Sequence, residues 1–239
     1  MTLPGIKALS GSLWRVVEGQ HVIATRNLVD STEEHDLLER LIDTAKPAPP
    51  TGPEFSGFHY LLTTPFRYPP LRHGSRFATR HERSIFYGST EIRAAFAETA
   101  YYRLLFLEGT KAKLEPIETD LSAFRIGYRT RKGMDITVRK TLSAPDSYEA
   151  SQAFGVQMRV SGVEAFRYAS ARDAEGGTNV GLFTPRAFTA KRPGTMQVWK
   201  ASASRSVVEV RRYDLLRPET FVYPREQFMV RGKLPRPAI

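Results

Sequence analysis

Residues 84–109 read SIFYGSTEIRAAFAETAYYRLLFLEG, a short apolar segment followed by a long helical pattern. The bulky residues at 84–88 predict a strand, and the run from about Ser89 to Gly109 predicts a helix. Glu98 lies in the middle of that helix, among small and aromatic residues. A strand that leads into a helix carrying this carboxylate is the starting point for the rest of the chain.

Strands predominate in the remaining pattern. The segments that predict strands or β-rich structure are 13–18, 21–26, 58–63, 113–138, 164–169, 180–183, 197–201 and 207–212, with a long loop at 64–83. A further helix is predicted to open at the capping-box spacing of Asp146 and Glu149 and to end near Gly162. Because the helices do not alternate regularly with strands, the fold class is α+β and not a doubly wound parallel sheet.

The clearest helix before this stretch spans 31–45. Ser31 and Glu34 have capping-box spacing, and its apolar side chains line one face: Leu37, Leu38, Leu41 and Ile42. The segment KPAPPTGP (46–53) follows, and its four prolines exclude a helix or a central strand. Since what precedes it is too short to be a domain, we interpret it as a connector within one domain.

Composition limits the function classes. The chain has 239 residues, 35 Lys and Arg against 25 Asp and Glu, and a net charge of +10, which suggests an anionic partner. It has no cysteine, which excludes disulfides, cysteine-based zinc sites and a thiol nucleophile. No secretory signal and no apolar run of membrane-spanning length is visible, so we expect a soluble, cytoplasmic protein without membrane contact.

Five arginines fall within the predicted loop at 64–83 and no lysine lies among them: Arg67, Arg72, Arg76, Arg80 and Arg83. The planar guanidinium binds phosphate oxygens bidentately, which a lysine ammonium does not. A solvated basic loop explains the same cluster equally well. A nucleic-acid groove is less favoured, because no helix-turn-helix spacing or RNA-recognition aromatic motif accompanies it.

Glu98 would face positions three and four residues away on its helix, which are occupied by alanine and tyrosine. No basic neighbour can neutralise it, so Glu98 is either functional or solvated at the helix edge. The segment YASARDAEGGTN (168–179) offers a tight glycine turn flanked by Ser170 and Asn179, two hydrogen-bonding residues. A plain hairpin loop has a similar composition.

The sequence lacks G-x-S-x-G, Walker A, G-x-G-x-x-G and H-E-x-x-H motifs. A serine hydrolase is therefore not expected. The five histidines have no metal-ligand spacing, so we predict no catalytic metal.

Taken in order, these pieces resemble the RES-domain family, which is named for an arginine, a glutamate and a serine. The matching residues are Leu13-Trp14-Arg15, Gly74-Ser75-Arg76-Phe77, Ile85-Phe86-Tyr87, Ala94-Ala95-Phe96-Ala97-Glu98, Ser170, Thr178-Asn179 and Leu182-Phe183-Thr184-Pro185. Members are toxins of bacterial toxin–antitoxin pairs whose partner is usually an Xre-type antitoxin. The resemblance implies a single domain over 1–239 with its core at about 12–188, an inserted helix and connector at 27–57, and C-terminal strands at 189–239.

The family fold is similar to ADP-ribosyltransferase toxins, with a cleft that binds NAD as substrate. By this resemblance the catalytic residues are Arg76, Tyr87, Glu98 and Ser170, and Asn179 lies among the NAD-binding residues. The second NAD-facing arginine is Arg15 or, in an alternative alignment, Arg67. Phe77 stands where many members have tryptophan, and the long gap before Arg76 resembles the longer branch of the family.

The chemistry implied is cleavage of the nicotinamide–ribose bond of NAD, with transfer of ADP-ribose to an unidentified cellular protein. Phosphate or water as acceptor is an alternative, and the chain would then only destroy NAD. A basic nucleic-acid-binding module is the alternative from another class, although we expect no direct nucleic-acid contact.

Overall fold

The computed structural model describes residues 3–19, 30–48, 50–67, 73–111, 116–214 and 216–237. The strands of its sheet are β1 (Lys7–Glu18), β2 (Phe86–Ser89), β3 (Ile117–Asp135), β4 (Ala165–Ala169), β5 (Thr178–Leu182), β6 (Met196–Ala203), β7 (Val207–Arg212) and β8 (Thr220–Pro224). The helices are α1 (Thr32–Ala45), α2 (Tyr60–Arg67), α3 (Ile92–Gly109) and α4 (Glu149–Val160), joined by short 3₁₀ turns. The predicted strand-rich α+β class is confirmed.

The sheet has the strand order β1-β2-β5-β4-β3-β6-β7-β8, and a further pairing joins β1 to β3. The 19-residue strand β3 runs antiparallel to β1, parallel to β4 at one end and antiparallel to β6 at the other. Because β1 also pairs with β2 through Trp14 and Ser89, the first five strands of that order form a closed ring. The parallel pair β3–β4 needs a crossover, and that crossover contains α4.

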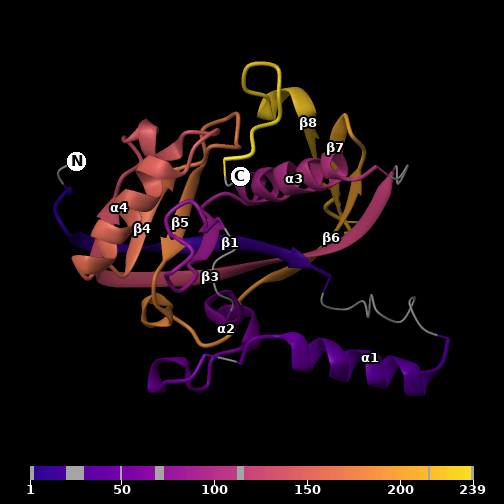
Figure 1. The fold of residues 1–239 in the computed structure, drawn as a ribbon, viewed down its shortest axis with the longest axis horizontal. Coiled ribbons are helices and arrows are strands. Elements are labelled where there is room, and N and C mark those ends of the chain that lie inside the picture. The colour runs from indigo at the N-terminus through magenta and orange to yellow at the C-terminus, as the bar shows by residue number, and fades with distance from the viewer. Residues whose placement is uncertain are drawn as a thin grey trace.

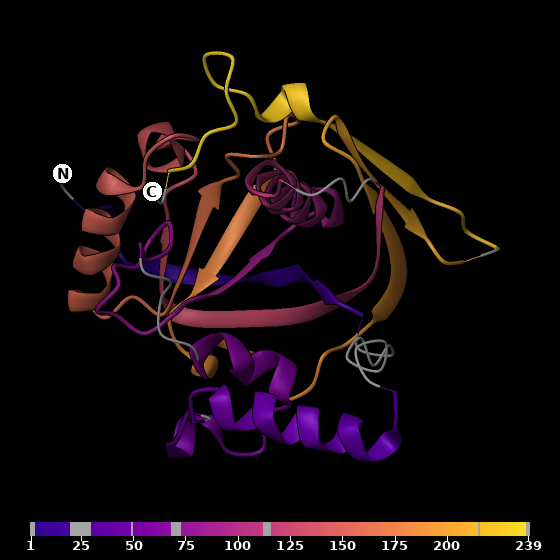
Figure 2. The same ribbon diagram turned by 45° about the vertical axis from the view of Figure 1, so that its right-hand side comes forward.

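Helix α3 lies in the hollow of the curled sheet, and α1 and α2 lie beyond the opposite face (Figures 1 and 2). The buried α3 residues Phe96, Ala100 and Leu104 belong to a core cluster with Trp199 and Tyr223 of the C-terminal strands. Four of its first nine residues are alanines with little or no exposure, which lets the helix approach the strands closely. The N-terminal half of α3, which carries Glu98, is thereby fixed against the sheet.

Two further clusters complete the core. One gathers α2 with β1, β2 and β5 around Leu62, Phe66 and Phe86. The other joins α4 to the segment before β2 through Phe154 and Phe77. Both clusters support the short segment 73–89, which brings Arg76 and Tyr87 to the same side of the molecule as α3.

Most predicted elements form close to their expected positions. The structure has β2 and α3 within the stretch 84–109 and β3 within 113–138. The strands predicted after residue 163 correspond to β4, β5, β6 and β7. At α1 the predicted cap is present, because the Glu34 amide donates to Ser31 Oγ at 3.1 Å. The apolar face of α1 is less buried than its pattern suggests, since Leu37 is 51% and Leu41 59% exposed. The predicted strand 21–26 lies outside the described residues.

Three predictions of local structure are wrong. Residues 58–63 enter helix α2 and form no strand, because Leu62 and Phe66 bury a helical i, i+4 stripe. The loop predicted from residue 64 is therefore helical as far as Arg67. The cap expected at Asp146 is absent: Tyr148 occupies the N-cap position of α4, without a side-chain hydrogen bond.

The sequence pattern does not predict strand β8, because the strand has only five residues and ends in a proline. It forms because β7 offers an edge with which Val222 and its neighbours pair. Within the described residues, no helix combines the length and apolar character needed to cross a membrane.

Gly155 tests how closely α4 packs on the segment that carries Arg76. A Cβ at this position would overlap the carbonyl of Phe77. Gly155→Ala is therefore expected to destabilise the fold by about 1–3 kcal/mol, although alanine ordinarily favours a helix. Thermal unfolding should show a midpoint lower by about 2–4 °C per kcal/mol.

Gly109 supplies the control, because a Cβ there would meet nothing within 4 Å. Gly109→Ala should leave the midpoint unchanged or raise it. Equal midpoints for the two variants would contradict the close packing of α4 on Phe77.

Candidate active site

A cavity of about 310 Å³ opens between α3, the strands β1 and β2, and the segment before β2. Its lining residues are Trp14, Arg15, Val16, Ser75, Arg76, Tyr87, Gly88, Ala95, Glu98, Thr99, Tyr102, Tyr148, Tyr168 and Asn179. Arginines, a carboxylate and several tyrosine rings thus share one concave surface. A small number of polar groups in an aromatic pocket is typical of small-molecule sites.

Glu98 is held in this cavity by neutral donors. Its Oε1 accepts hydrogen bonds from Asn179 Nδ2 at 2.7 Å and from Ser170 Oγ at 3.0 Å. Asn179 is itself fixed, because its Oδ1 accepts from Ser89 Oγ at 2.6 Å. Within the described part of the chain, Oε2 accepts no hydrogen bond and Glu98 forms no ion pair. The carboxylate is thus oriented without being neutralised.

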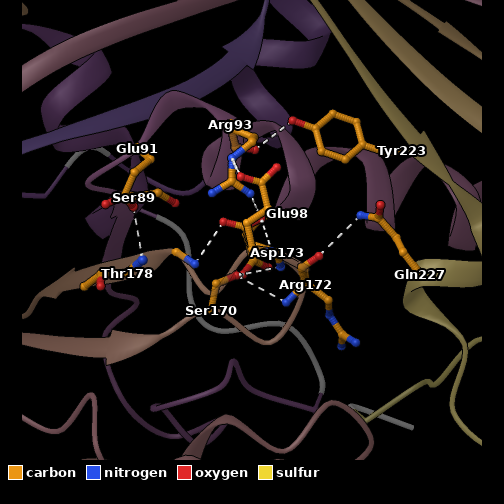
Figure 3. Close-up of polar contacts among 12 residues, drawn as sticks. Ser89, Glu91, Arg93, Glu98, Ser170, Arg172, Asp173, Thr178, Tyr223 and Gln227 are labelled. Atoms are coloured by element: carbon orange, nitrogen blue, oxygen red, sulfur yellow. Dashed lines mark hydrogen bonds and ion pairs between the residues drawn. The ribbon is translucent and has the colours of Figure 1, made fainter.

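Ser170 is oriented by its own loop (Figure 3). Its Oγ accepts hydrogen bonds from the backbone amides of Arg172 and Asp173, each at 3.2 Å. These two donors use the lone pairs of the hydroxyl, so its hydrogen is directed to Glu98. Ser170 therefore contacts the carboxylate from behind and is not among the cavity-lining residues.

Arg76 is only 8% exposed and lies on the cavity wall. Its Nη1 donates to the carbonyl of Ala144 at 2.8 Å, and its guanidinium lies 4.7 Å from the centre of the Tyr148 ring. Tyr87 fastens the adjoining backbone, because its hydroxyl accepts from the Phe77 amide at 3.1 Å and bonds with Ser75 Oγ at 3.0 Å. Burial raises the pKa of Tyr87 to about 12, so the phenol is neutral at ordinary pH.

Arg15 supplies a second guanidinium from β1. Its Nη1 donates to the carbonyl of Tyr87 at 2.6 Å, and the group lies 4.8 Å from the centre of the Phe86 ring. Burial lowers the pKa of Arg15 to about 10, which leaves it charged at pH 7. Its buried Nε has no hydrogen-bond partner among the described residues. An unpaired donor of this kind is costly unless a ligand uses it.

The arginine cluster of the sequence does not stay together. Arg67 ends α2, donates to the carbonyl of Pro47 and does not line the cavity. Arg83 is paired with Glu54 at 3.8 Å, and Arg80 is exposed beside His81. Arg72 lies outside the described residues. Of the cluster's described members, only Arg76 lines this cavity.

The sequence-predicted residues Arg15, Arg76, Tyr87, Glu98 and Asn179 therefore share one cavity, with Ser170 in contact behind Glu98. Of the two glycines in the turn, only Gly177 is closely packed against protein: a Cβ there would overlap Asp173 and Ala94, whereas a Cβ on Gly176 would meet nothing within 4 Å.

Three tyrosines of the cavity wall were not predicted as site residues. Tyr102 is one turn from Glu98, and its hydroxyl lies 3.4 Å from that of Tyr148. Tyr168 is buried, which raises its pKa well above the ordinary value. Two sequence signals could have identified two of these tyrosines. Tyr168 lies two residues before Ser170, and Tyr102 is four residues from Glu98 on the same helix. Tyr148 had none, because it reaches the cavity from the start of α4.

Comparison with known proteins gives one family. The family model described as RES domain matches residues 53–204 of this chain. The match includes Arg76, Tyr87, Glu98, Ser170 and Asn179, and it leaves out β1 with Arg15 as well as β7 and β8. No curated protein matches the chain.

Proposed function

This chain belongs to the RES-domain family, whose model matches well over half of its length, and from that premise we propose that it is an NAD-consuming toxin. It would cleave the nicotinamide–ribose bond and transfer ADP-ribose to a protein. The observation that carries the proposal is Glu98, an oriented carboxylate without a cationic partner among the described residues, in a cavity that it shares with Arg15 and Arg76.

Cleavage of an N-glycosidic bond passes through an oxocarbenium-like state, in which positive charge develops on the sugar. A fixed carboxylate near that sugar stabilises the charge and can accept a hydrogen bond from a ribose hydroxyl. Glu98 fits this role, because Oε1 is occupied by two donors and Oε2 has no donor among the described residues. The two hydrogen bonds orient the group before substrate arrives, so little reorganisation is needed.

The guanidinium groups suit the anionic half of the substrate. We assign Arg76 to the pyrophosphate or the adjoining ribose, since a planar fork binds phosphate oxygens bidentately. Arg15 is the second NAD-facing arginine in this proposal, because its buried Nε has no partner in the described part of the chain and Arg67 is directed to Pro47. Asn179 and Ser170 hold Glu98, and the Tyr87 ring is available to stack on nicotinamide. No metal has a role in this scheme.

The acceptor is proposed to be a cellular protein, and phosphate or water is the alternative outcome. We place the activity in the cytoplasm, in keeping with the cysteine-free chain. A nucleic-acid-binding module, the alternative from another class, would use the charge of +10 and leave NAD untouched.

Glu98→Gln is expected to abolish toxicity and lower nicotinamide release on the order of 10²-fold or more, because the charge is lost while size and shape are kept. The measurement is release of nicotinamide from NAD by purified protein. Thermal unfolding of the variant should match the wild type, which separates loss of chemistry from loss of fold. Near-normal turnover by Glu98→Gln would rule out this mechanism.

The same assay with labelled NAD and cell lysate distinguishes the candidate functions. Label on a protein band supports ADP-ribosyl transfer, and free nicotinamide without a band supports phosphate or water as acceptor. Unchanged NAD, together with steeply salt-dependent binding to any duplex, would favour the nucleic-acid module.

Arg76→Lys is expected to weaken NAD binding substantially although the charge is kept, because a lysine cannot bind two phosphate oxygens in one plane. Arg80→Lys is the matched control, since Arg80 is exposed and lies outside the cavity lining. Titration calorimetry with NAD measures both. Equal affinities would remove Arg76 from the proposed phosphate site.

We also propose an Xre-type antitoxin as partner, which inserts an acidic segment towards Arg15 and Arg76 and so excludes NAD. Because opposite charges steer association, added salt should lower mainly the association rate. Saturating NAD should weaken antitoxin binding to the purified toxin. Antitoxin affinity that is independent of NAD would place the contact on a remote face instead.

A further inference from the structure

An ion pair outside the cavity ties the loop of Ser170 to the helix of Glu98. Arg93, near the start of α3, pairs with Asp173, whose side chain is only 2% exposed (Figure 3). Arg93 Nε also lies 3.4 Å from Glu175 on the same loop. Among the residues described, the cavity lining includes neither Arg93 nor Asp173. The loop is thus attached to α3 twice, at Arg93 and at Glu98.

Asp173 also shapes the loop itself. Its Oδ2 accepts from the Gly177 amide at 2.9 Å, and its Oδ1 accepts from the Glu175 amide at 3.2 Å. The intervening Gly176 has φ +81°, a left-handed conformation that favours glycine. The Asp173 amide is one of the two donors that saturate Ser170 Oγ. One residue therefore closes the turn and fixes the hydroxyl that meets Glu98.

The C-terminal part of the chain supports the same junction. Tyr223 of β8 donates its hydroxyl to the Arg93 carbonyl at 2.8 Å. Gln227 in the following 3₁₀ turn (Arg225–Phe228) donates to the Arg172 carbonyl at 3.5 Å. Both residues lie beyond 204, where the family match ends. The C-terminal part of the chain thus contacts both α3 and the loop at the junction that holds Glu98.

We propose that Asp173, paired with Arg93, is a positioning residue that sets the orientation of Glu98 through Ser170. This inference rests on the proposed function of Glu98. Without the Asp173 carboxylate, the Gly177 and Glu175 amides no longer have one acceptor oxygen each, so the turn loosens. The backbone amides that direct Ser170 Oγ belong to this turn, and the direction of the hydroxyl then varies. Glu98 would then keep only Asn179 as a fixed donor, so its angle to the substrate sugar would vary.

The first test compares Asp173→Asn with the wild type in the nicotinamide-release assay. Turnover should fall between about 10-fold and 10²-fold, because a small misplacement of a reacting group has an effect of this size. KM for NAD should stay within about twofold, since Arg15 and Arg76 are untouched. Arg93→Gln, which alters a partly exposed side chain, should lower turnover in the same way if Asp173→Asn folds poorly.

Glu108→Gln is the matched control. Glu108 is also on α3 and pairs with Arg225 at 3.0 Å, so its loss weakens another contact between this helix and the C-terminal part. The control should lower the unfolding midpoint without lowering turnover. A merely structural role for Asp173 would make the two variants alike.

The second test is a double-mutant cycle. In a Ser170→Ala background, Asp173→Asn should lower turnover by less than about twofold, because Asp173 acts through a hydroxyl that is already absent. Hydrogen exchange at the Gly177 amide should accelerate in Asp173→Asn but not in Glu108→Gln. Additive losses in the cycle would overturn the proposed route through Ser170.

The outcomes separate this inference from the function beneath it. If the wild type releases nicotinamide and Asp173→Asn is equally active, only the positioning role of Asp173 is overturned. A wild-type protein that leaves NAD unchanged overturns the proposed function, and the positioning role falls with it.

Discussion

The pairing of β3 with three different strands is the constraint on which the structure depends. Its 19 residues join β1, β4 and β6, and the β1 pairing closes a ring that curls the sheet around α3. A flat sheet would present β1 and β2 to solvent, far from the helix. Closure instead brings Arg15 and Tyr87 opposite Glu98. The cavity is therefore a product of strand register, and the side chains that line it come from segments distant in sequence.

Inside the cavity, the negative charge of Glu98 is oriented by two neutral side chains, Asn179 and Ser170. Hydrogen bonds to a charged group contribute about 1.5–3 kcal/mol each, enough to offset part of the lost hydration of a half-buried carboxylate. An arginine at the position of Asn179 would hold Glu98 more tightly and would also neutralise it. Using an amide and a hydroxyl leaves the negative charge of the carboxylate available, which is what the proposed mechanism requires.

The residues that could be singled out from the sequence are those whose signal lies in their immediate neighbours. Glu98 stood out because its helical neighbours are alanines and tyrosines, and the order of Arg76, Tyr87, Glu98 and Ser170 carried the family resemblance. The helix α3 and the strand β3 were predictable because each has a long periodic pattern. These signals are local, and so they can be read without knowledge of the fold.

What could not be predicted depends on tertiary contacts. The proposal of Arg15 over Arg67 rests on the β1–β3 register and on a contact of Arg67 with Pro47. Residues 58–63 have the composition of a strand, but burial of Leu62 and Phe66 favours a helix. Strand β8 is short and exists because β7 offers an edge. Asp173 resembles any loop aspartate until its pairing with Arg93 is known.

The hydrogen bond from Tyr223 to the carbonyl of Arg93 also has a consequence for synthesis. Ribosomes make the chain from the N-terminus, so Tyr223 of β8 is made after every residue that lines the cavity. The core cluster around α3 gains Trp199, then Val210 and finally Tyr223 as the chain lengthens. A nascent or truncated chain therefore holds Glu98 on an incompletely supported helix. Full support of Glu98 in this way waits for β8, although the residues that line the cavity have already been made.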